Sequence, residues 1–154
     1  DAANQANDGI QRVTQAGNTG DPGGLDPNDL KSIAEKAYAA ARQFNYRGEY
    51  FANNPVLRKY SDEIIVHHSI PLEVLKKRPG LFTSSELNAA TNLRGIPTQL
   101  NNTLHLSEIH GQLWDNFWLE NPNATRAEIL EFAQKLEDRF NLQNLLYEYL
   151  NITK

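Results

Sequence analysis

Apolar residues recur every three or four positions in several stretches of the chain, which is the spacing of one face of an α-helix. The first stretch covers residues 28–44, and Asp26 predicts its start because an aspartate can accept hydrogen bonds from the free amides of a first turn. Residues 103–117 and 125–139 repeat the spacing, and a last helix is predicted over residues 142–150. Helices therefore account for most of the expected structure.

Two short runs have the pattern of strands instead. Residues 63–70 are rich in β-branched side chains, and Pro71 ends the run because proline cannot donate to a strand ladder. Residues 92–96 are apolar and are bounded by Pro97, which predicts a second strand antiparallel to the first. The sequence predicts an α+β fold in which a two-stranded hairpin and a helix form a small finger within a mainly helical domain.

The N-terminal segment differs in composition from the predicted helices and strands. Residues 1–25 are rich in Asn, Gln, Gly and Asp, and we expect a flexible linker from a larger carrier polypeptide, because such a segment buries little apolar surface. The chain of 154 residues does not begin with Met, which fits the same expectation. Residues 26–154 are predicted to form a single domain with the finger at residues 63–118.

Cysteine is absent, which excludes thiolate metal ligands and cysteine nucleophiles, so any metal must be held by imidazole or oxygen. No membrane span is expected, because no run approaches the ~18 apolar residues it requires. The net charge of -4 argues against a basic surface that coats nucleic acid. Local charge still matters near a phosphate, and the candidate nucleic-acid contacts are Lys76, Lys77, Arg78 and Arg94.

All 4 histidines of the chain lie between residues 63 and 118. His67 and His68 are adjacent, and His105 and His110 are close together in the predicted helix. Imidazole titrates near neutral pH and its neutral ring binds divalent ions, so the pattern indicates a metal site or an acid–base site. Imidazole ligands suit Zn, Ni or Mn better than Mg, and the identity of the ion stays open.

Regular geometry limits which histidines can meet. Successive strand residues point to opposite faces, so His67 and His68 share a site only where the strand ends or twists sharply. His105 and His110 would lie about 140° apart around a regular helix. Either His105 belongs to an irregular helix start beside a polar turn at residues 101–102, or one of the two is not a ligand, and we favour His105 as the ligand.

Three motifs in order carry a family resemblance. They are HHSIP at residues 67–71, NLRGIP at 92–97, and LHLSEIH at 104–110 followed by Trp114. This triplet resembles the HNH nucleases of the His-Me finger (ββα-metal) superfamily. It is similar in particular to the paired-histidine nuclease domains at the C-termini of bacterial polymorphic toxins. The resemblance covers about a third of the chain.

The resemblance implies a role for each matching position. His68 matches the general base that activates water, and His67 and His105 match metal ligands. Asn92 matches the residue that helps to orient the base and to hold the finger together. His110 lies one position beyond the usual helix spacing, so a metal ligand, a phosphate contact and a proton donor to the leaving group all remain open for it.

The implied function is metal-dependent cleavage of phosphodiester bonds by an antibacterial toxin domain. One divalent ion (Zn, Ni, Mn or Mg) is expected, with DNA favoured over RNA as substrate and little sequence preference. The resemblance also implies a cognate immunity protein, release or delivery from a bacterial producer, and action in the cytoplasm of the target cell. Two alternatives are an RNase toxin and a catalytically inactive finger that binds protein, and the acidic charge favours the latter.

Overall fold

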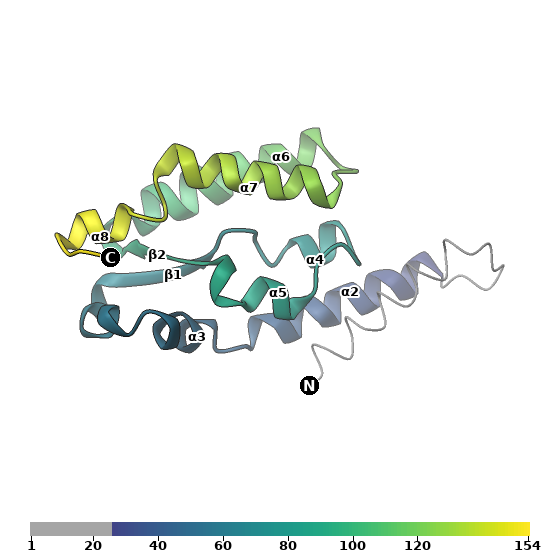
Figure 1. The fold of residues 1–154 in the computed structure, drawn as a ribbon. Coiled ribbons are helices and arrows are strands. Elements are labelled where there is room, and N and C mark those ends of the chain that lie inside the picture. The colour runs from purple at the N-terminus through teal and green to yellow at the C-terminus, as the bar shows by residue number, and fades with distance from the viewer. Residues whose placement is uncertain (1–25) are drawn as a thin grey trace. The chain divides into compact units, whose positions relative to one another are not determined.

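The computed structural model describes residues 26–154, so the linker predicted for residues 1–25 lies outside the described residues. The described chain divides into two compact units, which are considered separately (Figure 1). The first contains residues 26–44 and Pro71–Asn88, and the second contains Asn45–Ile70 and Ala89–Lys154. The single domain predicted for residues 26–154 stays a prediction.

The first unit is helical. Its helices are α2 (Pro27–Arg42), α4 (Val74–Lys77) and α5 (Ser84–Asn88). The predicted start of α2 is confirmed, because the side chain of Asp26 accepts a hydrogen bond of 2.8 Å from the amide of Asn28. The side-chain amide of the buried Asn88 donates to the carbonyl of Ala41 at 3.2 Å, which fastens α5 to α2.

The second unit combines one hairpin with helices. Its elements are α3 (Tyr46–Asn53), the 3₁₀ helix η1 (Pro55–Glu63), β1 (Ile64–His68), the 3₁₀ helix η2 (Ala90–Asn92), β2 (Leu93–Pro97), the 3₁₀ helix η3 (Thr98–Leu100), the π-helix η4 (Asn101–Trp114), α6 (Asp115–Glu120), α7 (Arg126–Phe140) and α8 (Leu145–Leu150). The predicted α+β class is confirmed. Among the described residues, no helix has the length and apolar character needed to cross a membrane.

The two strands pair in antiparallel register, as predicted. His67 lies opposite Arg94, and His68 lies opposite Leu93. Residues directly opposite one another in a hairpin present their side chains on the same face. His67 and Arg94 therefore share one face of the hairpin, and His68 and Leu93 share the other.

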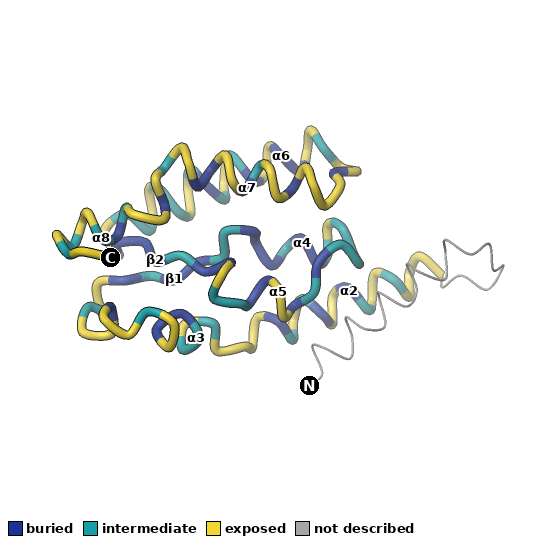
Figure 2. The backbone as a smooth tube through the Cα atoms, viewed as in Figure 1, coloured by how far each residue is buried: buried dark blue, intermediate teal, exposed yellow. Residues whose placement is uncertain are grey.

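The Leu93 face of the hairpin covers an apolar core, and both strands are largely buried (Figure 2). The buried members of this core are Tyr50, Phe51, Leu57, Ile64, Val66, Leu93 and Leu146. Gly95 allows the close approach of Tyr50, because a Cβ atom at Gly95 would lie 2.4 Å from the phenol oxygen. Core packing thus fixes the hairpin from one side and leaves the His67 face for other contacts.

Helix η4 departs from the prediction. A polar turn was expected at residues 101–102 and a regular helix after it, whereas a π-helix begins at Asn101. Hydrogen bonds of a π-helix join residues five apart rather than four, so residues five apart lie on one face. The buried residues of η4 are accordingly Ile109 and Trp114, and Leu106 is 51% exposed although the regular spacing placed it on the apolar face.

Aromatic contacts attach α7 to the end of η4 and to α6. Phe132 stacks on Phe117 with ring centroids 4.3 Å apart, and it meets Trp114 edge-on at 4.8 Å. Trp114 and Trp118 are both buried in the core. A capping box between Thr125 and Glu128 is present at the start of α7. This packing holds α7 beside the helix that carries two of the histidines.

Candidate metal centre

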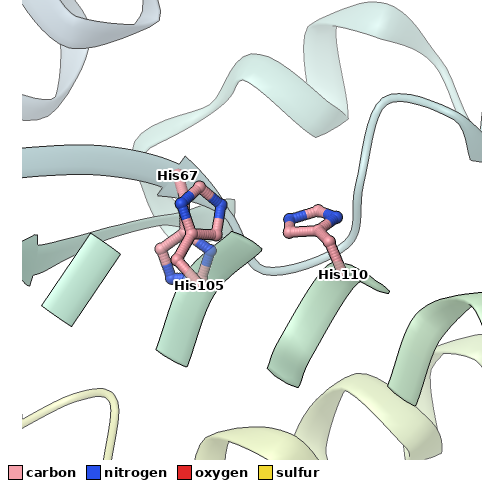
Figure 3. A group of neighbouring side chains, drawn as sticks. All are labelled: His67, His105 and His110. Atoms are coloured by element: carbon pink, nitrogen blue, oxygen red, sulfur yellow. The ribbon is translucent and has the colours of Figure 1, made fainter. Parts of the chain in front are cut away.

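Three histidines from distant parts of the sequence converge in the second unit. His67, His105 and His110 each offer one ring nitrogen, and these nitrogens lie within 4.8 Å of one another (Figure 3). The ring centroids of His67 and His105 are 4.7 Å apart, and those of His105 and His110 are 4.8 Å apart. The resemblance matched His67 and His105 to metal ligands and left a ligand role open for His110.

The π-helix explains how His105 and His110 reach one site. In a regular helix they would diverge by about 140°. The i to i+5 hydrogen bonding of a π-helix instead places residues five positions apart one above the other. Gly111 suits this winding, because a Cβ atom there would lie 3.0 Å from the carbonyl oxygen of Leu106. The expected irregularity is thus a property of the whole helix rather than of its start.

His67 carries two buried polar atoms without a partner. Its side chain is 3% exposed, and neither Nδ1 nor Nε2 has a hydrogen-bond partner among the described residues. An unsatisfied buried donor or acceptor costs about 1–3 kcal/mol, so native proteins rarely leave one without a reason. A cation that accepts a ring lone pair would satisfy one of these nitrogens.

Burial keeps two of the three rings neutral at physiological pH. The pKa of His67 is lowered well below its usual value, first by burial and then by His105, His110, His68 and Arg94. The pKa of His105 is lowered to about 4, again mainly by burial and then by His110 and His68. Neutral imidazole is the form that binds metals. Both residues therefore have a lone pair available at pH 7.

These pKa shifts predict a stability that falls in acid. Between pH 6.5 and about 4 the unfolded chain binds protons at His67 and His105 that the folded chain does not, so stability is lost as the pH drops. We expect the melting temperature of the chelator-treated protein to fall by several degrees over this interval. A thermal denaturation series against pH measures it, and a constant melting temperature would contradict the assignment of neutral rings.

Asn101 orients the ring of His105. Nδ1 of His105 lies 2.9 Å from Oδ1 of Asn101. An amide oxygen only accepts hydrogen bonds, so Nδ1 carries the proton and the lone pair lies on Nε2. Metal-ligating histidines in other proteins are held in the same way by a partner for the second ring nitrogen. Asn101 therefore fixes both the orientation and the tautomer that ligation by Nε2 requires.

Replacing Asn101 by alanine is expected to weaken metal affinity roughly tenfold, the lower end of the effect of removing such a partner. The ring of His105 would then be free to rotate and to change its tautomer. Zinc titration by calorimetry measures the change, and Asn102→Ala is the matched control because Asn102 is the exposed neighbour in the same helix. Equal losses in the two variants would show that helix η4 is merely weakened.

The residue types and their number fit a divalent transition metal. Zinc binds imidazole nitrogen at about 2.0–2.1 Å, which places tetrahedral ligand atoms about 3.4 Å apart. The nitrogens here lie within 4.8 Å, so small side-chain rotations close the difference. Sites with three protein ligands keep a position open for water or substrate, whereas structural zinc sites close all four.

His68 lies on the other side of the strand. It is half-buried, and its ring centroid is 4.6 Å from that of Tyr46 at an angle of 57°. It is not one of the three grouped histidines, although its charge would influence both His67 and His105. Because β1 ends at His68, the ring sits at the edge of the hairpin. Its role as a general base stays a prediction.

Asn92 ties together the ends of the two strands. Its side-chain amide donates to the carbonyl of Ile70 at 3.0 Å, and its side-chain oxygen accepts from the amide of Ile70 at 2.8 Å. The main-chain carbonyl of Asn92 also accepts from the amide of Ser69 at 2.8 Å. These bonds fix the segment that directly follows the histidine pair. Whether Asn92 also orients a catalytic base stays a prediction.

The predicted nucleic-acid contacts fall into different surroundings. Lys76, Lys77 and Arg78 belong to the first unit, where the ammonium of Lys76 lies 4.1 Å from the ring centroid of Tyr38. Arg94 belongs to the second unit, and its guanidinium donates to a carboxylate and to two main-chain carbonyls. Contact of these four residues with nucleic acid stays a prediction.

Comparisons with known proteins do not assign a family to this chain. No protein-family model, no curated protein and no solved structure matches it. The structure itself shows an antiparallel hairpin among helices and a cluster of three histidines. Both were expected from the three sequence motifs.

The sequence analysis missed one charged residue near the site. Glu137 of α7 was not among the candidate site residues, yet it is only 4% exposed and pairs with Arg94 at 2.8 Å. A signal for its burial was present, because Glu137 follows the buried Ala133 by four positions and so falls on the apolar face of the helix. Asn101 was missed because it was assigned to a turn.

Proposed function

We propose that this protein is a metal-dependent endonuclease that hydrolyses phosphodiester bonds. The observation that carries the proposal is the buried ring of His67, which has no hydrogen-bond partner among the described residues and lies beside His105 and His110. The grouped rings of His67, His105 and His110 supply a cation site, and His68, the next residue after His67, is the candidate base. These are the two needs of phosphodiester hydrolysis near neutral pH.

Each histidine has a distinct part in the proposed reaction. A divalent cation, when bound, stabilises negative charge on the scissile phosphate and on the leaving oxygen. His67, His105 and His110 would hold it, with Nε2 of His105 presented by Asn101. His68 would accept a proton from the attacking water. The bond from phosphorus to the leaving oxygen breaks as the new bond to the water oxygen forms, and the leaving oxygen takes a proton from solvent.

A nucleic-acid backbone is the proposed substrate because of the three motifs shared with His-Me finger nucleases. DNA is favoured over RNA. Little sequence preference is expected, since no helix in residues 26–154 has the features of a recognition helix that enters the major groove. The net charge of -4 opposes tight non-specific binding, so we expect cleavage to be sensitive to salt.

The direct test is cleavage of supercoiled plasmid and of RNA with and without a chelator. We expect nicked and linear plasmid in the presence of Mn, Zn, Ni or Mg, and loss of cleavage after chelation, because the cation carries much of the charge stabilisation. Adding back single ions identifies those that restore activity. Glu131→Gln is a suitable control, since Glu131 is 66% exposed on α7 and pairs with Lys135.

The other outcomes separate the alternatives. Cleavage of RNA alone would make the protein an RNase. Metal binding without cleavage of either polymer would favour the second candidate, a binding module that retains the finger without chemistry, which the acidic composition supports. Cleavage that persists in chelator would contradict metal dependence.

The proposed toxin role, like the substrate, comes from the resemblance of the three motifs to those of bacterial toxin nucleases. We infer that the domain is delivered from a bacterial producer as part of a larger carrier, acts in the cytoplasm of the target cell and is neutralised by a cognate immunity protein. Induced expression in a bacterial host is expected to arrest growth and to degrade DNA, and His68→Ala should relieve both effects. Growth arrest that persists with His68→Ala would point to another cause.

A further inference from the structure

The buried carboxylate of Glu137 joins three segments of the second unit. Its Oε2 accepts a hydrogen bond of 2.8 Å from Nε of Arg94 on β2, and its Oε1 accepts one from the hydroxyl of Ser69. Glu137 itself lies on α7, 43 positions after Arg94 and 68 after Ser69 in sequence. One side chain thus fastens α7 to β2 and to the segment after β1, at the end of the hairpin where the two histidines lie.

Burying the carboxylate of Glu137 with its partner Arg94 costs free energy, so the position of this ion pair calls for an explanation. Taking a carboxylate and a guanidinium out of water carries a desolvation penalty that their attraction often fails to offset, so buried pairs are weak contributors to stability. Glu137 is 4% exposed and Arg94 is 19% exposed, whereas Glu131, which forms an ion pair elsewhere on α7, is 66% exposed. A role other than stability is therefore to be sought for Glu137.

Both partners of Glu137 are next to the histidine pair. Ser69 directly follows His68 in the chain, and Arg94 lies opposite His67 in the strand register. Arg94 is itself held by hydrogen bonds from Nη1 to the carbonyls of Thr91 and Leu93, at 2.9 and 2.8 Å. The carboxylate of Glu137 therefore binds Arg94, which lies opposite His67, and Ser69, which follows His68.

We propose that Glu137 is a positioning residue for the metal centre, which holds β1 and the segment after it so that His67 meets His105 and His110. The ring of His67 has no hydrogen bond of its own to orient it among the described residues, so its position depends on the backbone that carries it. Asn92, the residue before β2, fixes that backbone from one side, and Glu137 fixes it from α7. This inference rests on the metal site of the proposed function but not on nuclease activity.

Two variants remove the contacts of Glu137 in different ways. Ser69→Ala deletes one hydrogen bond to Glu137 and leaves the ion pair intact. The double variant R94M/E137M replaces the ion pair by apolar side chains of similar length, a change that often preserves or raises stability. Glu131→Gln is the matched control on the same helix. If the double variant does not fold, Ser69→Ala alone decides the question.

Cobalt is the probe, because its visible absorption reports the number and geometry of its ligands independently of catalysis. We expect wild-type protein and Glu131→Gln to bind Co²⁺ with the same affinity and spectrum. Ser69→Ala and R94M/E137M are expected to bind it about tenfold more weakly, as when outer partners of a ligand are removed, and with an altered spectrum. Thermal denaturation of the metal-free proteins shows that each variant is folded.

Unchanged cobalt affinity and spectrum in the folded variants would overturn the inference, since Glu137 would then have only a structural role. Failure of the wild-type protein to bind cobalt would overturn both the inference and the metal site. Wild-type protein that binds cobalt but cleaves no nucleic acid would contradict the proposed nuclease, while weaker binding by the variants would still support the positioning role of Glu137.

Discussion

Replacing His67 by leucine is expected to abolish metal binding and to stabilise the metal-free protein at the same time. The affinity should fall more than about 100-fold, beyond the range for residues that only orient a ligand, because one of three ligands is lost. Leucine has a similar size and removes two buried nitrogens that lack partners among the described residues. The free energy of unfolding should rise by about 1–2 kcal/mol, since an unsatisfied buried polar group costs this much.

The two effects are measured separately. Urea denaturation in the presence of chelator gives the free energy of unfolding, and calorimetric titration with zinc gives the affinity. His68→Leu is the control, because His68 is the neighbouring histidine and lies outside the grouped three. A loss of stability in His67→Leu without metal would mean that the ring has a structural role of its own, and unchanged zinc affinity would exclude it as a ligand.

Replacing His68 by alanine is expected to reduce cleavage by about 10²–10⁴-fold, the usual contribution of a general base. Metal affinity should change little, because the ring of His68 packs on Tyr46 and is not one of the grouped histidines. The variant therefore separates chemistry from metal binding. It also distinguishes a nuclease, which should lose activity, from a binding module, which has no cleavage to lose.

Single-turnover plasmid cleavage measures the rate, and zinc titration of the same preparation measures the affinity. Added imidazole is expected to restore part of the lost rate, since a small base can enter the space left by the ring. Tyr46→Phe is the control, because it keeps the aromatic contact with His68 and removes only the hydroxyl. If His68→Ala cleaves plasmid at the wild-type rate, a group other than His68 accepts the proton.

The elements of the fold were predictable because each has a local cause. A β-branched run, a short apolar run and bounding prolines marked the two strands, and Asp26 marked the start of a helix. The antiparallel pairing followed from the same pattern. The clustering of His67, His105 and His110 was anticipated from residue type and from the three motifs, but their geometry was not.

The missed features depend on contacts between distant segments or on an unusual helix. Periodicity arguments assume regular helical spacing, so they placed Leu106 on the apolar face and separated His105 from His110. The burial of Glu137 is completed by Arg94 and Ser69, which are remote in sequence. The strand register places the side chain of His67, and not that of His68, on the face of the hairpin away from the apolar core. A single sequence does not specify this register.

The winding of helix η4 has a consequence for the spacing of its two histidines. Residues four apart share a face in an ordinary α-helix, and residues five apart share a face in the wider π form. Pitch and spacing can therefore compensate one another: a related chain that is one residue shorter between these histidines and winds its helix more tightly would present the same pair of rings. The separation of such ligands along a sequence is thus meaningful only together with the helix that bears them.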